Sequence, residues 1–327
     1  MAKALTFLFA LLLPLPLAGE GRGEGSGDAP VLRWFKGNTH THTLRSDGDS
    51  SPEDVVRWYR QHGYDFLVIT DHDKITTISD DKLLLIPGEE VTDRLPKTPL
   101  HVNAIGLKSV VKPQGGSSPA DVLQRNVNAI REAGGIPAIN HPNFGWAFGT
   151  DVLKKLENVK LVEIASGHPY VNMEGGGGVP SVEKMWDDVL TSGKTLYGIA
   201  VDDSHHLKFE STKGDVALPG KGWIVVRAAS LTPEAIMKAL ERGEFYASKG
   251  PELADYTVTD NSISVTLRER GEAKFRTQFI GSGGRVLLES VENPATYTIR
   301  GDEGYVRTKV IDSNGNAAWT QPVRVRR

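Results

Sequence analysis

Histidine and carboxylate side chains recur in short groups along the chain, and six of the nine histidines lie at predicted strand ends. His40 and His42 are two residues apart on an extended segment, so both imidazoles point the same way and can bind one metal ion. The candidate metal ligands are His40, His42, Asp47, His72, Glu90, His101, His141, Asp203 and His205. Chance does not place so many such donors at strand ends, and the sequence therefore predicts a metal centre.

The donor types limit which metal this centre can hold. The chain contains no cysteine, so no thiolate is present to act as a ligand or as a nucleophile. Imidazole, carboxylate and water suit Zn, Mn or Fe better than Cu(I) or an iron–sulfur cluster. We therefore expect divalent zinc, manganese or iron.

Short apolar runs alternate with helical stretches between Val31 and about Gly250 and predict the elements that position these residues. Ser51-Pro52, Ser118-Pro119 and Thr232-Pro233 predict helix starts, because a hydroxyl cap before a proline favours the first turn. The predicted buried strands are 65–70, 83–87, 101–106, 136–140, 160–165 and 195–201. Such β-α units favour a parallel sheet, open or closed into a barrel, with sites at the carboxyl ends of its strands. His101 is the exception, because it begins its strand.

The pattern changes after Pro251, where short alternating runs are separated by turn signals such as Asn314-Gly315. This spacing predicts a small antiparallel β-sandwich over residues 251–327. The segment contains no histidine and no other obvious chemistry.

The N-terminus has the order of a secretory signal. Lys3 precedes an apolar run from Ala4 to Ala18, and a Gly-rich linker over residues 19–30 follows. The run is shorter than the roughly 20 residues that a helix needs to cross a bilayer, so we expect residues 1–18 to be a cleaved signal peptide rather than a stable span. Export to the periplasm or the outside of the cell follows, with an uncleaved anchor as the alternative.

Composition narrows the possible partners. A formal net charge of −3 gives no electrostatic reason to bind nucleic acid, so we expect a small-molecule partner. The oligomeric state is open.

The motifs Thr39-His40-Thr41-His42-Thr43, Thr70-Asp71-His72, Asn140-His141-Pro142 and Asp203-Ser204-His205 closely resemble those of the PHP (polymerase and histidinol phosphatase) superfamily. Within it, the chain looks like the secreted branch described as carbaryl-hydrolase-like. The resemblance covers residues from about 31 to 250. It implies an α/β fold, a distorted (β/α)7 barrel, with two or three divalent ions at one mouth and with the β-sandwich as a second domain.

The resemblance also implies how the ligands are shared among the ions. His40, His42 and Asp203 would hold one ion; Asp47, His72 and His205 a second; His101 and His141 a third; and Glu90 would bridge. Glu90 is preferred to Glu89 because the family's acid stands two residues after the strand-end glycine. Asp71 is expected to orient a ligand rather than to bind metal. Asp202 and His206 have no clear counterpart, and His206 could replace a ligand.

The expected reaction is hydrolysis by a hydroxide that bridges the metal ions, without a protein nucleophile. Asp203, His205 and His206 are candidates to protonate the leaving group. Arg45 and Lys208 could clamp a phosphate, or be solvated surface charges. Trp146 and Phe148 could form an apolar wall for the leaving group or cover the barrel mouth. His168 could line the entrance or be a plain loop residue, and His62 is expected to end a helix.

Three functions remain open at this point. The favoured one is a metal-dependent phosphoesterase that acts on phosphate mono- or diesters outside the cytoplasm. The second is a hydrolase of carbamate or carboxylic esters that uses the same centre. The third is a non-catalytic binding protein that a structural metal site stabilises, although nine candidate ligands exceed what a closed four-coordinate site needs.

Overall fold

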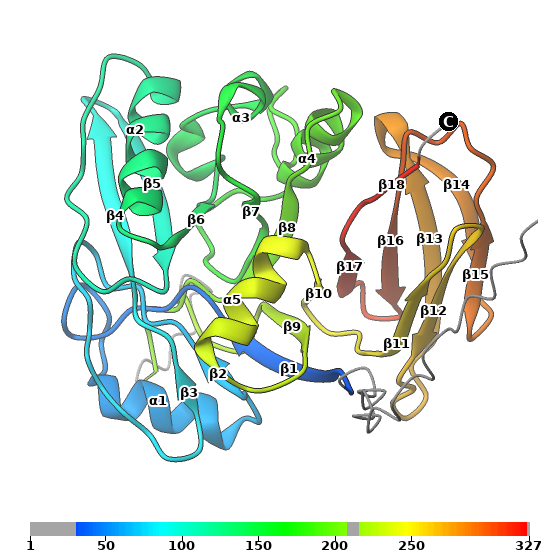
Figure 1. The fold of residues 1–327 in the computed structure, drawn as a ribbon, viewed down its shortest axis with the longest axis horizontal. Helices are drawn as coiled ribbons and strands as arrows, with labels where there is room; N and C mark the ends of the chain where they lie inside the picture. The colour runs from blue at the N-terminus through cyan, green and yellow to red at the C-terminus, as the bar shows by residue number, and fades with distance from the viewer. Residues whose placement is uncertain (1–30, 208–215, 326–327) are drawn as a thin grey trace, which may run out of the picture. The chain divides into compact units, whose positions relative to one another are not determined.

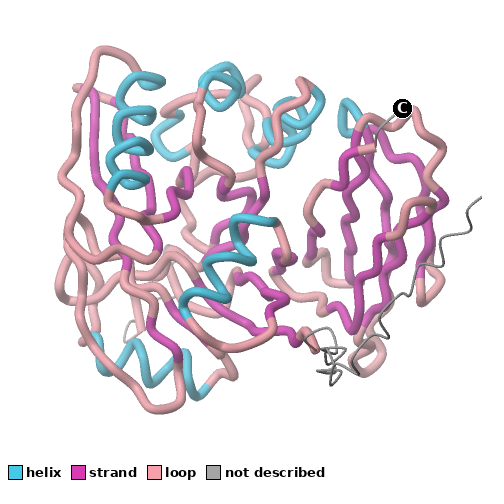
Figure 2. The backbone as a smooth tube through the Cα atoms, in the orientation of Figure 1, coloured by secondary structure: helices cyan, strands magenta, loops and turns pink. Residues whose placement is uncertain are grey.

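A computed structural model of the chain describes residues 31–207 and 216–325. The predicted signal peptide and linker, and Lys208, therefore lie outside the described residues. None of the helices in the described part is both long enough and apolar enough to cross a membrane. Figure 1 shows the order of the elements, which is mixed α/β up to β10 (Phe245–Ser248). Figure 2 shows strands and loops after that point, with one short 3-10 helix, η2 (Ser282–Gly284), and residues 251–325 contain no α-helix.

One sheet has the strand order β4-β5-β6-β7-β8. Its strands are β4 (Gly88–Leu95), β5 (Thr98–Ile105), β6 (Ile136–Ile139), β7 (Leu161–Ser166) and β8 (Tyr197–Val201). The pairs β6–β7 and β7–β8 are parallel, as expected, but β5 runs antiparallel to both β4 and β6. The reason is local: Leu95 pairs with Thr98, and a two-residue connection can join only antiparallel strands.

A second sheet has the strand order β14-β13-β16-β17-β10-β9-β1-β2-β3, with β18 paired to β16. Its earlier strands are β1 (Arg33–Asn38), β2 (Phe66–Leu67), β3 (Leu84–Leu85), β9 (Trp223–Ala228) and β10. Its later strands are β13 (Phe275–Gly281), β14 (Arg285–Ser290), β16 (Tyr305–Asp312), β17 (Ala317–Thr320) and β18 (Val323–Arg324). The antiparallel pairing of β10 with β17 carries this sheet past residue 250.

The two sheets meet at isolated parallel bridges. Thr41, just after β1, bridges to Ser204, just after β8, and His72, after β2, bridges to Glu90 of β4. Within the described ranges, the continuous ladders do not close into a barrel. The bridges nevertheless bring the ends of β1, β2 and β8 together with β4, which is where the predicted ligands lie.

The helices pack on these sheets (Figure 1): α2 (Pro119–Glu132) lies on β4, β5 and β6, α4 (Val182–Thr191) on β7, and α5 (Pro233–Arg242) on β9. Three helix starts were predicted correctly. Ser51, Ser118 and Thr232 each accept a hydrogen bond from the backbone N–H three residues on, which satisfies one unpaired donor of the first turn. The remaining helices are α1 (Pro52–Gln61), which ends at His62 as expected, and α3 (Thr150–Lys155).

A third, antiparallel sheet consists of β11 (Leu253–Val258), β12 (Ser262–Leu267) and β15 (Ala295–Thr298). Its buried side chains Ile263, Ala295 and Tyr297 form a cluster with Phe279 of β13 and Val306 of β16. Two layers of strands thus share a small core after residue 250. Along β12 the apolar residues are buried and the polar residues between them are half-buried, which matches the alternation of the sequence that predicted this strand.

Candidate metal centre

The structure brings all nine predicted metal ligands together where the two sheets meet. Loops supply most of them: His40, His42 and Asp47 follow β1, His72 follows β2, His141 follows β6, and Asp203 and His205 follow β8. The strands β4 and β5 supply Glu90 and His101. The donor atoms of eight of them form overlapping groups, which are His42–Asp47–His72–His205, His40–His42–Asp203 and His40–Glu90–His141. The ninth, His101, is in none of these groups and contacts Glu90.

The antiparallel course of β5 explains the position of His101. Because β5 runs against β6, its beginning lies beside the end of β6, and the N–H of Asn140 donates to the carbonyl oxygen of His101 at 3.3 Å. His101 near a strand start and His141 past a strand end therefore lie at the same edge of the sheet. An all-parallel sheet would have separated these two residues.

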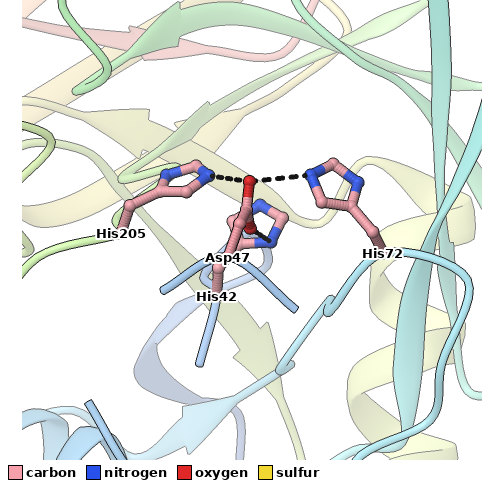
Figure 3. Close-up of side chains that lie close together, drawn as sticks. All are labelled: His42, Asp47, His72 and His205. Atoms are coloured by element: carbon pink, nitrogen blue, oxygen red, sulfur yellow. Dashed lines mark ion pairs between the residues drawn. The ribbon is translucent and has the colours of Figure 1, made fainter. Parts of the chain in front are cut away.

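Asp47 is the centre of the outermost group, which Figure 3 shows. Its Oδ2 lies 3.3 Å from Nε2 of His72 and 3.4 Å from Nε2 of His205, so the carboxylate stands between the two rings. Its Oδ1 lies 3.5 Å from Nδ1 of His42. About half of the Asp47 side chain (52%) is exposed, whereas His42 is buried. Solvent therefore reaches this group from the Asp47 side.

Glu90 is the centre of the inner part of the site. Its Oε1 lies 2.9 Å from Nδ1 of His101 and 3.4 Å from Nε2 of His141. Its Oε2 lies 3.1 Å from Nδ1 of His72, and also within 3.5 Å of Nε2 of both His40 and His42. One buried carboxylate thus contacts five imidazoles from four different segments, which is the position that a bridging ligand requires.

The grouping differs in three respects from the one the family resemblance implies: His101 is in none of the groups, and His40 and His42 each belong to two. His42 belongs to two groups: its Nδ1 faces Asp47, and its Nε2 lies 3.1 Å from Nε2 of His40. Since neutral imidazole binds a metal through one nitrogen at a time, His42 can serve either group but is not committed to one by this arrangement.

The buried carboxylates of the site favour the presence of positive charge beside them. Burial alone would lower the pKa of His40, yet the carboxylates of Asp203 and Glu163 raise it well above its ordinary value. Burial would raise the pKa of Glu90, but His101 and His40 hold it well below its usual range. Burial alone would also lower the pKa of His72, but Asp47 and Glu90 raise it to about 9. Protons on imidazoles balance these carboxylates here, and divalent cations can take over that role.

The spacing of the donor atoms fits such cations. Two ligands at about 2.0–2.1 Å from a tetrahedral zinc ion lie about 3.3 Å from each other. In the group His40–His42–Asp203 the three separations between donor atoms are 3.1, 3.2 and 3.5 Å. The residues present therefore fit a bound divalent metal ion. Asp203 also has a left-handed backbone (φ 49°), a conformation that aspartate tolerates better than most residues and that often occurs at functional sites.

The sequence analysis missed Glu163, a fully buried residue of β7. Its Oε1 lies 2.6 Å from Nδ1 of His40, and its Oε2 accepts a hydrogen bond from the N–H of His141 at 2.9 Å. The carboxylate thus fixes the ring of one candidate ligand and the backbone of another. A signal was present, because Glu163 is the one acid in the predicted strand 160–165, and glutamate is almost never fully buried unless it is paired.

Three nearby acids lie outside the donor groups. Glu89 points to the other side of β4, where its Oε1 accepts from the N–H of Val111 and burial raises its pKa to about 7. Asp202 accepts hydrogen bonds from Asn38 and Tyr59, and burial raises its pKa. Asp71 accepts from Ser46 Oγ, which lies 3.4 Å from Nδ1 of His42. Asp71 thus acts on a ligand through Ser46, as an orienting residue would.

The centre borders a cavity of about 220 Å3. Besides seven of the nine predicted ligands, its lining consists of Phe144, His168, Val171 and His206. Arg45, which the sequence suggested as a phosphate clamp, instead lines a separate surface pocket with Lys74. Trp146 and Phe148 do not line the cavity either, and Phe144 supplies the aromatic wall in their place. Burial lowers the pKa of His168 to about 4, so its imidazole is neutral near pH 7.

Comparison with known proteins gives matches to solved structures alone. No family model matches the chain, and no curated protein does. A two-domain protein from Bacteroides vulgatus containing a predicted PHP-like metal-dependent phosphoesterase matches at 17% identity with a TM-score of 0.51, covering 89% of this chain and 96% of that one. An amidohydrolase from Chromobacterium violaceum, with bound sulfate and no metal, matches at 15% identity with a TM-score of 0.37, covering 56% of this chain and 90% of that one. At this identity, the first match shows that the chain shares the fold of that two-domain protein.

Proposed function

We propose that this protein is a metal-dependent phosphoesterase of the PHP superfamily that hydrolyses phosphate mono- or diesters. The observation that carries the proposal is Glu90, whose two oxygens reach His101 and His141 on one side and His72, His40 and His42 on the other. Two metal ions sharing one carboxylate are a recurrent device of phosphate-ester hydrolysis. The PHP motifs of the sequence and the two-domain fold support the same conclusion.

The proposed ligands are the nine residues predicted from the sequence, holding two or three ions of Zn, Mn or Fe. The absence of thiolates and the presence of imidazoles and carboxylates support that choice of metals. Bound cations would polarise a phosphoryl oxygen and lower the pKa of water. The cavity at the centre also argues against a closed, purely structural metal site.

The chain's own residues would orient the metal ligands and manage protons. Nδ1 of His205 lies 3.0 Å from the carbonyl oxygen of Asp203, an acceptor, so the ring proton belongs on Nδ1 and the lone pair of Nε2 faces Asp47. Nδ1 of His206 accepts from the N–H of Ala217 at 3.2 Å, which leaves the proton of the neutral ring on Nε2. His206 lines the cavity and stays, with Asp203 and His205, a candidate to protonate the leaving group. A neutral imidazole does not give up its N–H proton, so His206 would first have to break its hydrogen bond with Ala217 and take up a second proton at Nδ1.

A second candidate is a hydrolase of carbamate or carboxylic esters, as in the carbaryl-hydrolase-like branch. Phe144 and Val171 line the cavity, and within the described ranges no lysine or arginine does, which suits an uncharged ester with an apolar group. In this reading the same metal centre would act on a carbonyl carbon.

The test is hydrolysis of three esters by the full chain loaded with Mn or Zn: bis(p-nitrophenyl) phosphate, p-nitrophenyl phosphate and p-nitrophenyl acetate. We expect turnover of a phosphate ester that His205→Ala abolishes. His62→Ala, a histidine that stacks on Trp58 at the end of α1, is the matched control and keeps full activity. Turnover of the acetate alone, equally sensitive to His205→Ala, would favour the second candidate. Loaded protein that hydrolyses none of the three would contradict both.

Two proposals on organisation accompany the function. We propose that β1, β2 and β4–β8 form a distorted seven-stranded barrel within residues 31–250, and that residues 251–327 are a separate β-sandwich domain. The bridges Thr41–Ser204 and His72–Glu90 support the first, and the shared core of β12, β13, β15 and β16 supports the second. We also propose export directed by residues 1–18, which N-terminal sequencing of protein recovered outside the cytoplasm would test.

A further inference from the structure

His168 borders the cavity without belonging to any of the donor groups. It lies in the loop that follows β7, two residues after Ser166. Among the residues that the structure describes, the groups of atoms that could hold a metal ion do not include it, whereas the lining of the cavity does. Its side chain therefore faces whatever fills the cavity and is not a candidate metal ligand.

One hydrogen bond determines the tautomer of this histidine, and a second one holds its backbone. The backbone N–H of Tyr170 donates to Nδ1 of His168 at 3.2 Å, and the backbone N–H of His168 donates to Oγ of Ser166 at 3.2 Å. A backbone N–H can only donate, so Nδ1 must present its lone pair. The proton of the neutral ring then resides on Nε2.

This Nε2–H has no hydrogen-bond partner within residues 31–207 and 216–325. Neighbouring rings hold the imidazole in place: its centroid lies 5.3 Å from that of His205, 5.7 Å from that of Tyr170 and 6.3 Å from that of Phe144. His168 is thus a positioned donor with one free N–H, and it lies beside a candidate ligand.

We propose that the Nε2–H of His168 donates a hydrogen bond to a non-bridging oxygen of the substrate's phosphoryl group. The proposal rests on the phosphoesterase function proposed above. His168 would hold the reacting group against the metal centre and stabilise negative charge on that oxygen. No proton is transferred, because the ring keeps its Nε2–H throughout.

Two measurements on the full chain test this role. Nitrogen-15 NMR of the imidazoles reports the tautomer directly, and we expect the Nε2–H form for His168. Calorimetric titration of the metal-loaded protein with inorganic phosphate measures the hydrogen bond. His168→Ala should weaken phosphate binding about two- to tenfold with the bound metal content unchanged, and His168→Gln, which keeps a side-chain N–H, should recover part of the loss. His62→Ala is the matched control and should bind phosphate as the wild type does.

The outcomes separate this role from the proposed function. A His168 ring in the Nδ1–H form, wild-type protein that does not bind phosphate, or a His168→Ala variant with unaltered phosphate affinity would overturn the assignment even if esters are hydrolysed. Loss of a metal ion in His168→Ala would make the residue a ligand and would overturn it as well. Failure of all ester hydrolysis would instead count against the phosphoesterase, while the tautomer and the phosphate titration would still decide the role of His168.

Discussion

Oε1 of Glu163 lies 2.6 Å from Nδ1 of His40, and both side chains are completely buried. This carboxylate leaves Nε2 of His40 to face Asp203, His42 and Glu90, which are the other candidate ligands. A carboxylate behind a metal-binding imidazole fixes the ring and increases its basicity. Glu163 is therefore the residue outside the ligand set on which the metal centre should depend most.

The first prediction is that Glu163→Gln lowers the affinity for divalent metal about 10- to 100-fold. Glutamine keeps the volume of the side chain and an acceptor for the N–H of His141, but it removes the charge that supports His40. Competition between the apoprotein and a chelating dye for Zn or Mn measures the affinity. The matched control is Glu157→Gln at a mostly exposed glutamate (77%), and equal affinities for the two variants would contradict the prediction.

The second prediction concerns the number of bound ions. Asp47 belongs to one donor group, whereas His40 belongs to two. Asp47→Ala should therefore lose one metal ion per chain and keep the others. His40→Ala should lose more than one metal ion per chain. Elemental analysis after gel filtration counts the ions, and circular dichroism checks that both variants are folded. An Asp47→Ala protein devoid of metal would show that the groups do not fill independently.

The sequence predicted the parts of this site that depend on local order. Helix starts at Ser51, Ser118 and Thr232 follow from cap chemistry, and the choice of Glu90 over Glu89 followed from the spacing of the family's motif. What it missed depends on pairing between distant segments. Nothing within residues 98–105 indicates that β5 runs against β6, although this direction places His101 beside His141. The same holds for Arg45, which follows a ligand segment in sequence but faces a different pocket.

After residue 250, too, features that depend on local sequence were predicted and features that depend on distant pairing were not. The alternating runs at 262–268, 274–280 and 305–312 predict β12, β13 and β16 closely. No such run covers β17, whose four residues are all buried and therefore do not alternate. The pairing of β17 with β10 depends on the tertiary fold. From the sequence, Arg307 of β16 is an ordinary charged residue in a strand. In the structure, it is buried against α4 and binds Asp187.

The third prediction is that Arg307→Ala destabilises the fold by about 3–5 kcal/mol, because it leaves a buried charge without its partner. Nε and Nη2 of Arg307 each donate to Asp187 at 2.7 Å, and Nη2 also donates to Glu183 at 2.9 Å. Urea unfolding measures the free energy. Arg268→Ala, which removes a mostly exposed arginine (65%), is the control and should change stability by less than about 1 kcal/mol. A comparable loss in both variants would contradict the assigned role of the buried pair.

The fourth prediction is that Glu183 makes the stability of the fold depend on pH in the acid range. Burial would raise the pKa of this carboxyl, but the charges of Arg307 and Lys309 lower it below its ordinary value of 4.5. A carboxyl whose pKa is lower in the folded state adds stability above its unfolded pKa and loses it as the pH falls through the folded one. Glu183→Gln should thus lower the melting temperature at pH 7, and the difference from wild type should shrink as the pH falls below about 4.5.

Thermal unfolding of both proteins at a series of pH values between 7 and 3 measures this difference. Both must be stripped with a chelator, because acid also releases metal from histidine ligands and would add its own pH dependence. Glu157→Gln is again the control, since that carboxylate is mostly exposed and its ion pair with Lys194, at 3.4 Å, lies at the surface. A difference between Glu183→Gln and wild type that stays constant down to pH 3 would show that the contacts with Arg307 and Lys309 do not depend on the charge of Glu183. The contribution of Glu183 would then come from packing rather than from the ion pairs.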